Sequence, residues 1–296
     1  MDIVQIKNIS KHFGKKEVLK NLSLHVPENS IFGFIGKNGA GKTTAMKMML
    51  GLLKIDDGEI YINGEKVVYG ETNQHIGYLP DVPTFYDFMN AYEYLFYCGE
   101  LNGLSKVENQ KRCEELLKLV GLSQEKHRIK GFSRGMKQRL GIAQALINRP
   151  KLLICDEPTS ALDPIGRKEI LDLLLSLKEQ TTVLFSTHIL SDVERICSDV
   201  AFLEDGKIQM QGKISELKVT HRQNEYVLEI EKDSDVQLLL SKFKSLYRQQ
   251  NQLFLRGKDN EIGEILEYIL NHNISFLKIE RLEPTLESLF MEMVEL

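Results

Sequence analysis

A glycine-rich stretch, GKNGAGKT at residues 36–43, has the composition and spacing of a loop that binds phosphate groups. Glycines allow backbone N–H groups to curl around an anion, and a helix that starts there adds the positive end of its dipole. Lys42 can neutralise the outer phosphates, and the Thr43 hydroxyl can bind magnesium. The apolar run Ser30–Ile35 precedes the loop and the helix-like stretch Thr43–Gly51 follows it, as this motif requires. The predicted phosphate-binding residues are Gly36, Asn38, Gly39, Ala40, Gly41, Lys42, Thr43 and Thr44.

Two acidic residues, Asp156 and Glu157, end an apolar run that begins at Leu152. Such a run is typical of a buried parallel strand. Beside a phosphate-binding loop, Asp156 is expected near the magnesium ion, and Glu157 is expected to polarise the water that attacks the γ-phosphate. Acids at strand ends are also common as solvated groups or caps. The two acids alone do not predict a catalytic site. They do so here because a phosphate-binding loop occurs in the same sequence.

Three further residues have both a structural and a functional interpretation. His188 follows the predicted strand Thr182–Ser186, where ligands of parallel sheets gather, but a lone histidine is more often structural. Phe13 is either a packing aromatic or a platform for an adenine ring. Ser133 precedes a helix-like run as an N-cap does, and Gly135 leaves backbone N–H groups accessible to an anion. The residues alone do not separate an anion site from a capped helix.

The elements that must position these residues form a strand–helix alternation with a helical insertion. Strand-like runs with a hairpin turn at Asn63-Gly64 come first: Ile3–Ile6, Val18–Val26 and Glu59–Ile62. Runs typical of parallel strands are Ser30–Ile35, Lys151–Cys155, Thr182–Ser186 and Val200–Leu203. Residues 85–148 have mainly helical patterns, and Asp163-Pro164 predicts a helix start with Asp163 as N-cap.

Near residue 220 the pattern changes to a small α+β arrangement. Strands are predicted at Tyr226–Ile230, Gln252–Leu255 and Phe276–Ile279. Helices are predicted at Val236–Tyr247, Glu261–Leu270 and Pro284–Val294. The sequence therefore predicts one domain over about 1–218, with a helical subdomain over about 83–148, and an accessory domain over 221–296 that shows no site.

Composition argues against several classes of protein. The net charge of −4, from 38 Lys+Arg and 42 Asp+Glu, disfavours a general nucleic-acid binder. The four cysteines lie far apart in the sequence, so we expect reduced thiols and neither a zinc site nor disulfides. The first residues are too polar for a signal peptide, and no apolar run is long enough to span a bilayer. We expect a chain that is soluble when isolated.

Together these motifs resemble those of the nucleotide-binding subunit of an ABC (ATP-binding cassette) transporter, over about residues 1–218. Phe13 matches the adenine-stacking position, residues 36–43 match Walker A, and Cys155–Glu157 matches the end of Walker B. Residues 132–136, FSRGM, match the family signature LSGGQ, and His188 matches the switch histidine. The resemblance implies an α/β fold, namely a P-loop NTPase with a RecA-like parallel sheet core, an antiparallel β subdomain, a helical insertion and a small C-terminal α+β domain.

The resemblance also implies a division of roles. Two cassettes of this family pair head to tail, and each ATP lies between one P-loop and the signature of the other chain. The residues that would bind ATP in trans are Ser133, Arg134, Gly135 and Met136. Glu157 would be the general base, with Lys42 and His188 stabilising charge on the γ-phosphate. Asp163, at the end of the D-loop Ser160–Asp163, would couple the two sites.

Two positions depart from the family pattern. The loop after the strand IGYL usually carries Gln, or Glu in exporter relatives, whereas this sequence has Asp81. Thr43 and Asp156 would hold Mg²⁺, and the shorter side chain of Asp81 leaves its own contact with the ion open. Arg134 replaces the first Gly of LSGGQ, and it either faces solvent or touches the nucleotide.

The implied partners are an integral membrane permease on a separate chain and a second copy of this chain or a related ATPase subunit, with no nucleic acid. This places the chain at the cytoplasmic face of the cell membrane, in an exporter-type subgroup that moves drugs, peptide antibiotics or ions. In the aromatic stretch Thr84–Tyr97, we expect most rings to pack within the helical insertion and others to form the groove that receives the permease.

Two alternatives belong to other classes. A soluble ABC ATPase that acts on ribosomes or DNA usually has two cassettes or a long coiled-coil insertion, and this sequence has neither. A P-loop kinase or GTPase would leave the signature stretch without a role, and the guanine-reading pattern NKxD does not occur.

Overall fold

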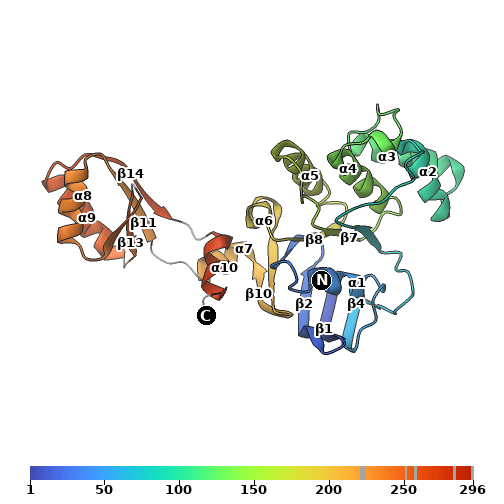
Figure 1. Ribbon diagram of the computed structural model, residues 1–296, viewed down its shortest axis with the longest axis horizontal. Coiled ribbons are helices and arrows are strands. Elements are labelled where there is room, and N and C mark those ends of the chain that lie inside the picture. The colour runs from blue at the N-terminus through green and yellow to red at the C-terminus, as the bar shows by residue number, and fades with distance from the viewer. Residues whose placement is uncertain (221–224, 251, 257–258, 283–284, 295–296) are drawn as a thin grey trace. The chain divides into compact units, whose positions relative to one another are not determined.

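The computed structural model describes residues 1–220, 225–250, 252–256, 259–282 and 285–294. The chain divides into two compact units, Met1–Ile214 (unit 1) and Ser215–Leu296 (unit 2). Figure 1 labels many of the elements of both units.

Unit 1 contains an antiparallel sheet with the strand order β2-β1-β4-β5 (Figure 1). Its strands are β1 (Asp2–Phe13), β2 (Lys16–Pro27), β4 (Asp57–Ile62) and β5 (Glu65–Lys66). The predicted hairpin is confirmed, because Ile62 pairs with Glu65 across the turn. Asn63 and Gly64 in that turn have φ values of 51° and 79°, which this tight hairpin requires.

A second, six-stranded sheet of unit 1 has the order β10-β9-β3-β8-β7-β6. Its strands are β3 (Ile31–Ile35), β6 (Ile76–Leu79), β7 (Leu152–Asp156), β8 (Thr182–Thr187), β9 (Asp199–Glu204) and β10 (Lys207–Lys213). All neighbours pair in parallel except β10, which is antiparallel to β9. Every residue of β3, β7 and β8 is buried, as their continuous apolar sequences predict.

One apolar core joins the two sheets of unit 1 through α1 (Lys42–Met49). Met46 and Met49 of this helix pack in the same cluster as Ile6 of β1 and Phe34 of β3. Two further helices of the unit are α5 (Pro164–Ser176) and α6 (Leu190–Ile196). The helix that follows the phosphate-binding loop is therefore fixed between both sheets.

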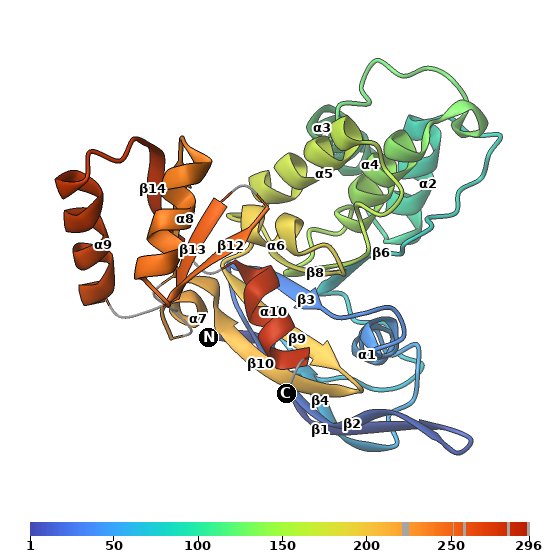
Figure 2. The same cartoon turned by 60° about the vertical axis from the view of Figure 1, so that its left-hand side comes forward.

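The helical part of unit 1 contains α2 (Ala91–Leu101), α3 (Lys106–Leu119), the short 3₁₀ helix η1 (Ile129–Gly131) and α4 (Arg134–Ala145), as predicted for residues 85–148. Figures 1 and 2 both place α2, α3 and α4 together. Helix α4 packs closely on β6, because a Cβ atom on Gly77 would lie only 2.1 Å from the Ala145 carbonyl oxygen. A glycine in β6 thus lets α4 approach the parallel sheet.

Of the rings in Thr84–Tyr97, most of which we expect to pack within the helical insertion, four are buried or half-buried and three are exposed. Only Tyr94 is buried, whereas Tyr86 and Phe88 are exposed by 49% and 65%. The rings contact one another near the surface, with Tyr86 5.8 Å from Phe88 between ring centroids.

Unit 2 starts with α7 (Ile214–Thr220), one residue of which belongs to unit 1. Its antiparallel sheet has the order β12-β13-β11-β14. The remaining elements, in chain order, are β11 (Glu225–Ile230), α8 (Asp233–Lys242), β12 (Leu246–Gln249), β13 (Gln252–Arg256), α9 (Asp259–Asn271), β14 (Phe276–Leu282) and α10 (Leu286–Val294). From β11 to β14 this is a βαββαβ arrangement, built around a separate apolar core.

The prediction of one helix over Val236–Tyr247 is wrong at its end. Helix α8 stops at Lys242, and Tyr247 lies in β12, which was not predicted. The start predicted at Pro284 falls outside the described residues. No helix in the described part of the chain is long and apolar enough to cross a membrane.

Candidate active site

The predicted site residues follow four neighbouring parallel strands of the six-stranded sheet. Gly36 follows β3, Asp81 follows β6, Glu157 follows β7 and His188 follows β8. Because the carboxyl ends of parallel strands meet at one edge of a sheet, this topology brings the four positions to a common edge.

The phosphate-binding loop connects β3 to α1, and its last residue, Gly41, is the N-cap of α1. Gly41 has a φ of 114°, a conformation that strongly favours glycine. A Cβ atom on Gly41 would also lie 2.7 Å from Leu19 Cδ2. Both the backbone conformation and the space available therefore favour glycine at this position. The N-terminal N–H groups of α1 are therefore free to face an anion.

Lys42 points back over the loop that precedes it. Its Nζ donates to the carbonyl oxygens of Gly36, at 2.6 Å, and Lys37, at 3.4 Å. Nζ also lies 3.4 Å from Glu157 Oε1, and the two side chains are only 6% and 13% exposed. The ammonium group is thus held next to the acid at the end of β7.

Asp156 is bound on both carboxylate oxygens. Thr43 Oγ1 donates to Oδ2 at 2.9 Å, and Ser186 Oγ donates to Oδ1 at 2.7 Å. Mg²⁺ is usually held by one or two protein oxygens together with substrate phosphates and water. No cluster of three or more His, Cys, Asp or Glu that could hold a metal occurs within the described residues. The Thr43 and Asp156 oxygens fit an ion that completes its ligands from a phosphate chain.

Glu157 has a left-handed backbone, with a φ of 47°. This conformation is uncommon for a non-glycine residue, and it turns the chain away from β7. It is stabilised by the Glu157 N–H, which donates to the Ser186 carbonyl oxygen at 3.1 Å and to Ser186 Oγ at 3.3 Å. His188 Nδ1 lies 3.1 Å from Glu157 Oε2. The glutamate is therefore held from the backbone, by Lys42 and by His188.

Phe13 ends β1, and its side chain is 50% exposed, as a platform for a base must be. Lys11 Nζ lies 5.6 Å from the ring centroid and 2.5 Å from Asp56 Oδ1. Asp56 Oδ2 also accepts a bond from the His12 N–H at 2.7 Å, and the hydrogen bond from Lys11 lowers the pKa of Asp56. The strand end that carries Phe13 is therefore tied to the loop before β4.

Ser133 is the N-cap of α4, as predicted, and its Oγ accepts a bond from Met136 N–H at 3.2 Å. A Cβ atom on Gly135 would have no neighbour closer than 4.0 Å, so the helix start is open on that side. Arg134 does not simply face solvent. Its Nη2 lies 3.5 Å from Asp81 Oδ1 and 3.2 Å from Ser160 Oγ of the same chain.

Asp81 and Asp163 also have partners within the chain. Ser160 Oγ donates to Asp81 Oδ1 at 2.5 Å, so Asp81 is bound by Ser160 and Arg134. The contact of Asp81 with magnesium stays a prediction. Asp163 caps α5, because its Oδ1 accepts a bond from Gly166 N–H at 3.1 Å.

Comparison with known proteins identifies the family. Residues 19–160 match the family model described as ABC transporter, and residues 212–294 match that of the ATP-binding protein DrrA1-3-like, C-terminal domain. The uncharacterized ABC transporter ATP-binding protein YxlF of Bacillus subtilis is 39% identical over 296 residues, which cover 99% of each chain. The chain belongs to the ABC transporter ATP-binding proteins.

Other relatives of this ABC protein agree. The bacitracin transport ATP-binding protein BcrA of Bacillus licheniformis is 35% identical, with 99% of this chain and 97% of that protein covered. A solved dimeric ATP-binding cassette in a post-hydrolysis state, bound to ADP and Pi, is 27% identical with a TM-score of 0.62, covering 71% of this chain and 98% of that chain. The family and the P-loop fold predicted from the sequence are confirmed. The chain is an ATPase.

The structure adds two residues that contact the predicted site residues of this ABC protein and that the sequence analysis did not assign. Ser186 holds both Asp156 and the backbone of Glu157, and Ser160 holds Asp81. A hydroxyl at the end of a predicted strand was the available signal for Ser186. This hydroxyl could be linked to Asp156 only through the pairing of Asp156 in β7 with Ser186 in β8, and the sequence does not specify that pairing.

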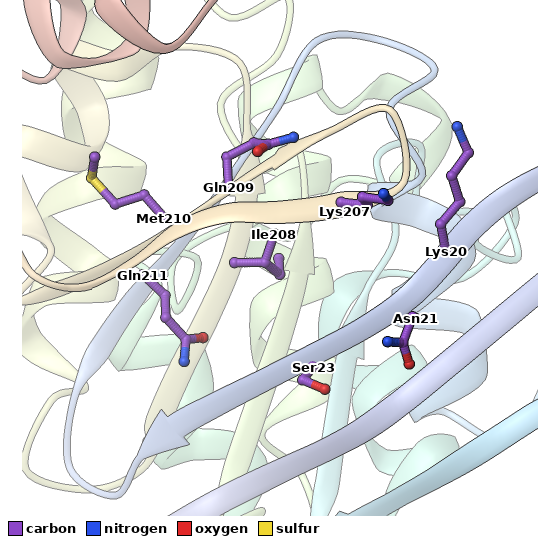
Figure 3. Close-up of a pocket in the computed structure, with 8 residues that line it drawn as sticks. All are labelled: Lys20, Asn21, Ser23, Lys207, Ile208, Gln209, Met210 and Gln211. Carbon is purple, nitrogen blue, oxygen red and sulfur yellow. The ribbon is translucent and has the colours of Figure 1, made fainter.

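Two surface hollows of the ABC protein lie away from the predicted catalytic residues. One of about 440 Å³ is lined by residues of β2 and β10, with Lys20 and Lys207 toward one end and Met210 toward the other (Figure 3). The other, of about 1080 Å³, is lined by residues such as Leu52, Tyr78 and Leu101. Glu157, Lys42 and His188 line neither. These three predicted catalytic residues are therefore not enclosed by either hollow.

The four cysteines are free. Burial raises the pKa of Cys113 to about 11 and also raises the pKa of Cys155, which directly precedes Asp156. These thiols are protonated at neutral pH, and they add no reactive group to the site.

Proposed function

We propose that this ATPase pairs with a second copy of itself or a related subunit on ATP, and that the pairing powers a separate membrane permease of exporter type. Each ATP would lie between the phosphate-binding loop of one chain and Ser133–Met136 of the other. The similarity to a dimeric cassette and to bacitracin transport proteins supports this proposal.

The observation that carries the proposal is that two helix starts, both of which we expect to face an anion, lie apart within unit 1. Helix α1 starts beside Lys42 and Glu157, whereas α4 starts at Ser133 in the helical part. Both views place α1 and α4 in different parts of unit 1 (Figures 1 and 2). A second chain can supply the missing half to each site.

The side chains of this chain would act on the terminal phosphate as follows. Glu157 would accept a proton from the attacking water, and His188 would hold the Glu157 carboxylate in place. Lys42 would leave Glu157 for the phosphate oxygens, which carry more negative charge. Thr43 and Asp156 would hold Mg²⁺, which neutralises charge on the phosphate oxygens when bound.

The larger hollow supports docking of the permease. It is bordered by the sheet-containing part of unit 1 and by its helical part, since Leu52 follows α1 and Leu101 ends α2. These two side chains are 63% and 70% exposed, so the hollow offers apolar surface that a partner could cover. We propose that a cytoplasmic segment of the permease occupies this hollow and places the chain at the cytoplasmic face of the membrane.

The tagged chain, isolated from detergent-solubilised membranes of its natural host, tests the function. We expect an integral membrane protein to co-purify in a fixed ratio, because docking buries exposed apolar side chains. Leu52→Glu should abolish this co-purification, whereas Leu175→Glu, at a side chain 45% exposed on α5, should preserve it. Ribosomal proteins or DNA in place of a membrane protein would instead support the soluble alternative.

A further inference from the structure

Three polar side chains from separate segments of unit 1 form one cluster. Arg134 lies at the start of α4, Asp81 follows β6, and Ser160 lies in the turn after Glu157. Asp81 Oδ1 accepts from Ser160 Oγ at 2.5 Å and from Arg134 Nη2 at 3.5 Å, and Arg134 Nη2 also lies 3.2 Å from Ser160 Oγ. The cluster thus joins the helical part to two loops of the parallel sheet.

Helix α4 holds the Asp81 loop at a second point. Gln138 Nε2 donates to the Asp81 carbonyl oxygen at 2.8 Å, and the Gln138 side chain is fully buried. Arg134 and Gln138 are four residues apart, so they lie on the same face of the helix. Two adjacent contacts restrict both the position and the rotation of the start of α4.

The same cluster reaches the predicted catalytic base through the backbone. Ser160 N–H donates to the Glu157 carbonyl oxygen at 3.0 Å, which closes the turn between these two residues. The orientation of the Ser133 helix start is therefore linked to the segment that carries Glu157.

We propose that Arg134 is a positioning residue that acts through Asp81 and Ser160 of its own chain and thereby sets the ATP concentration at which two chains pair. This inference rests on the proposed ATP-driven pairing. The Arg134 guanidinium is engaged by Asp81, so its charge orients the helix start and does not serve as a contact to the partner's nucleotide.

The size of the effect follows from exposure. The side chains of Arg134 and Asp81 are 44% and 48% exposed, so water screens their attraction. Exposed pairs of this kind contribute little, and their loss corresponds to about a two- to fivefold change in an equilibrium constant.

The test is a double-mutant cycle in a Glu157→Gln background, which is expected to retain ATP. The ATP concentration for half-maximal pairing is measured by light scattering for Arg134→Met, Asp81→Asn and the double variant. Each value is divided by the same variant's Kd for ATP, measured at low protein concentration where chains are monomeric. We expect each single variant to raise the ratio about two- to fivefold, and the double variant to raise it no further.

Arg195→Met is the matched control, because Arg195 forms an exposed ion pair with Asp172 that does not involve α4. This variant should leave the ratio unchanged. The inference would be overturned if the double variant raised the ratio by the product of the two single effects. It would also be overturned if Asp81→Asn left the ratio unchanged. Either result would show that Arg134 acts directly on the nucleotide. Failure of the Glu157→Gln chain itself to pair on ATP would overturn the proposed function as well.

Discussion

At the scale of single residues, the predicted site consists of charged and polar groups that contact one another. Glu157 contacts Lys42 and His188, and Asp156 contacts Thr43 and Ser186. The acids and the loop were predictable, because each belongs to a short contiguous motif of the sequence. Their partners were not, because Ser186 reaches Asp156 only through strand pairing and Arg134 reaches Asp81 only through packing of α4 on β6.

A prediction at this scale concerns Glu157→Gln. The amide has nearly the same shape but cannot accept the proton, so we expect the rate of ATP hydrolysis to fall about 10²- to 10⁴-fold. ATP binding should persist, because Lys42 and the backbone of the loop remain. Steady-state phosphate release and equilibrium nucleotide binding measure the two effects separately.

The control for this substitution is Glu179→Gln, at an exposed glutamate after α5. It should hydrolyse ATP as the unchanged chain does. Turnover near the normal rate in Glu157→Gln would remove Glu157 from the role of general base.

At the scale of elements, local patterns predicted starts better than ends. The Asp163-Pro164 start of α5 was correct, because capping is a local interaction. Strand β12 was missed, because Phe243 continues the apolar spacing of α8 and no glycine or proline marks the break. Only pairing with β13 converts Leu246–Gln249 into a strand, and such pairing overrides local preference.

Asp163 allows capping and inter-site coupling to be separated. Asp163→Ala removes the cap and should lower the free energy of unfolding by about 1 kcal/mol. Asp163→Asn keeps a cap oxygen and should change it by less than about 0.5 kcal/mol. Urea denaturation measures these differences.

If Asp163 also couples the two ATP sites, both variants should lower the Hill coefficient of ATP hydrolysis, because neither keeps the carboxylate charge. Normal cooperativity in Asp163→Asn would restrict this residue to its role as a cap.

At the scale of the whole molecule, each unit has an apolar core among its described residues, and these cores share no residue. The core of unit 1 surrounds α1, and the core of unit 2 lies between its sheet and the helices α8 and α9. The sequence indicated this division by a change of pattern near residue 220, and the compact units divide after Ile214. The boundary between compact units depends on packing, whereas local sequence patterns report only where the type of element changes.

Separate cores predict two unfolding transitions in calorimetry. A non-hydrolysable ATP analogue at about 100 times its Kd should stabilise unit 1 by about 2.7 kcal/mol and raise the Tm of that transition by about 5–10 °C. The transition of unit 2 should not move, because the predicted nucleotide contacts all lie in unit 1. In the Lys42→Ala variant, addition of the analogue should shift neither transition, because Lys42 is a predicted phosphate contact. If the analogue shifted both transitions of the unchanged chain together, the two units would not unfold independently.

The Lys42–Glu157 ion pair has a consequence for the charge that the site presents to a phosphate chain. The ammonium group and the carboxylate lie 3.4 Å apart, so each offsets much of the other's charge. A neutral residue in place of Glu157 would leave the ammonium group unopposed. The same substitution that removes the proton acceptor would therefore also strengthen the attraction of the site for anions.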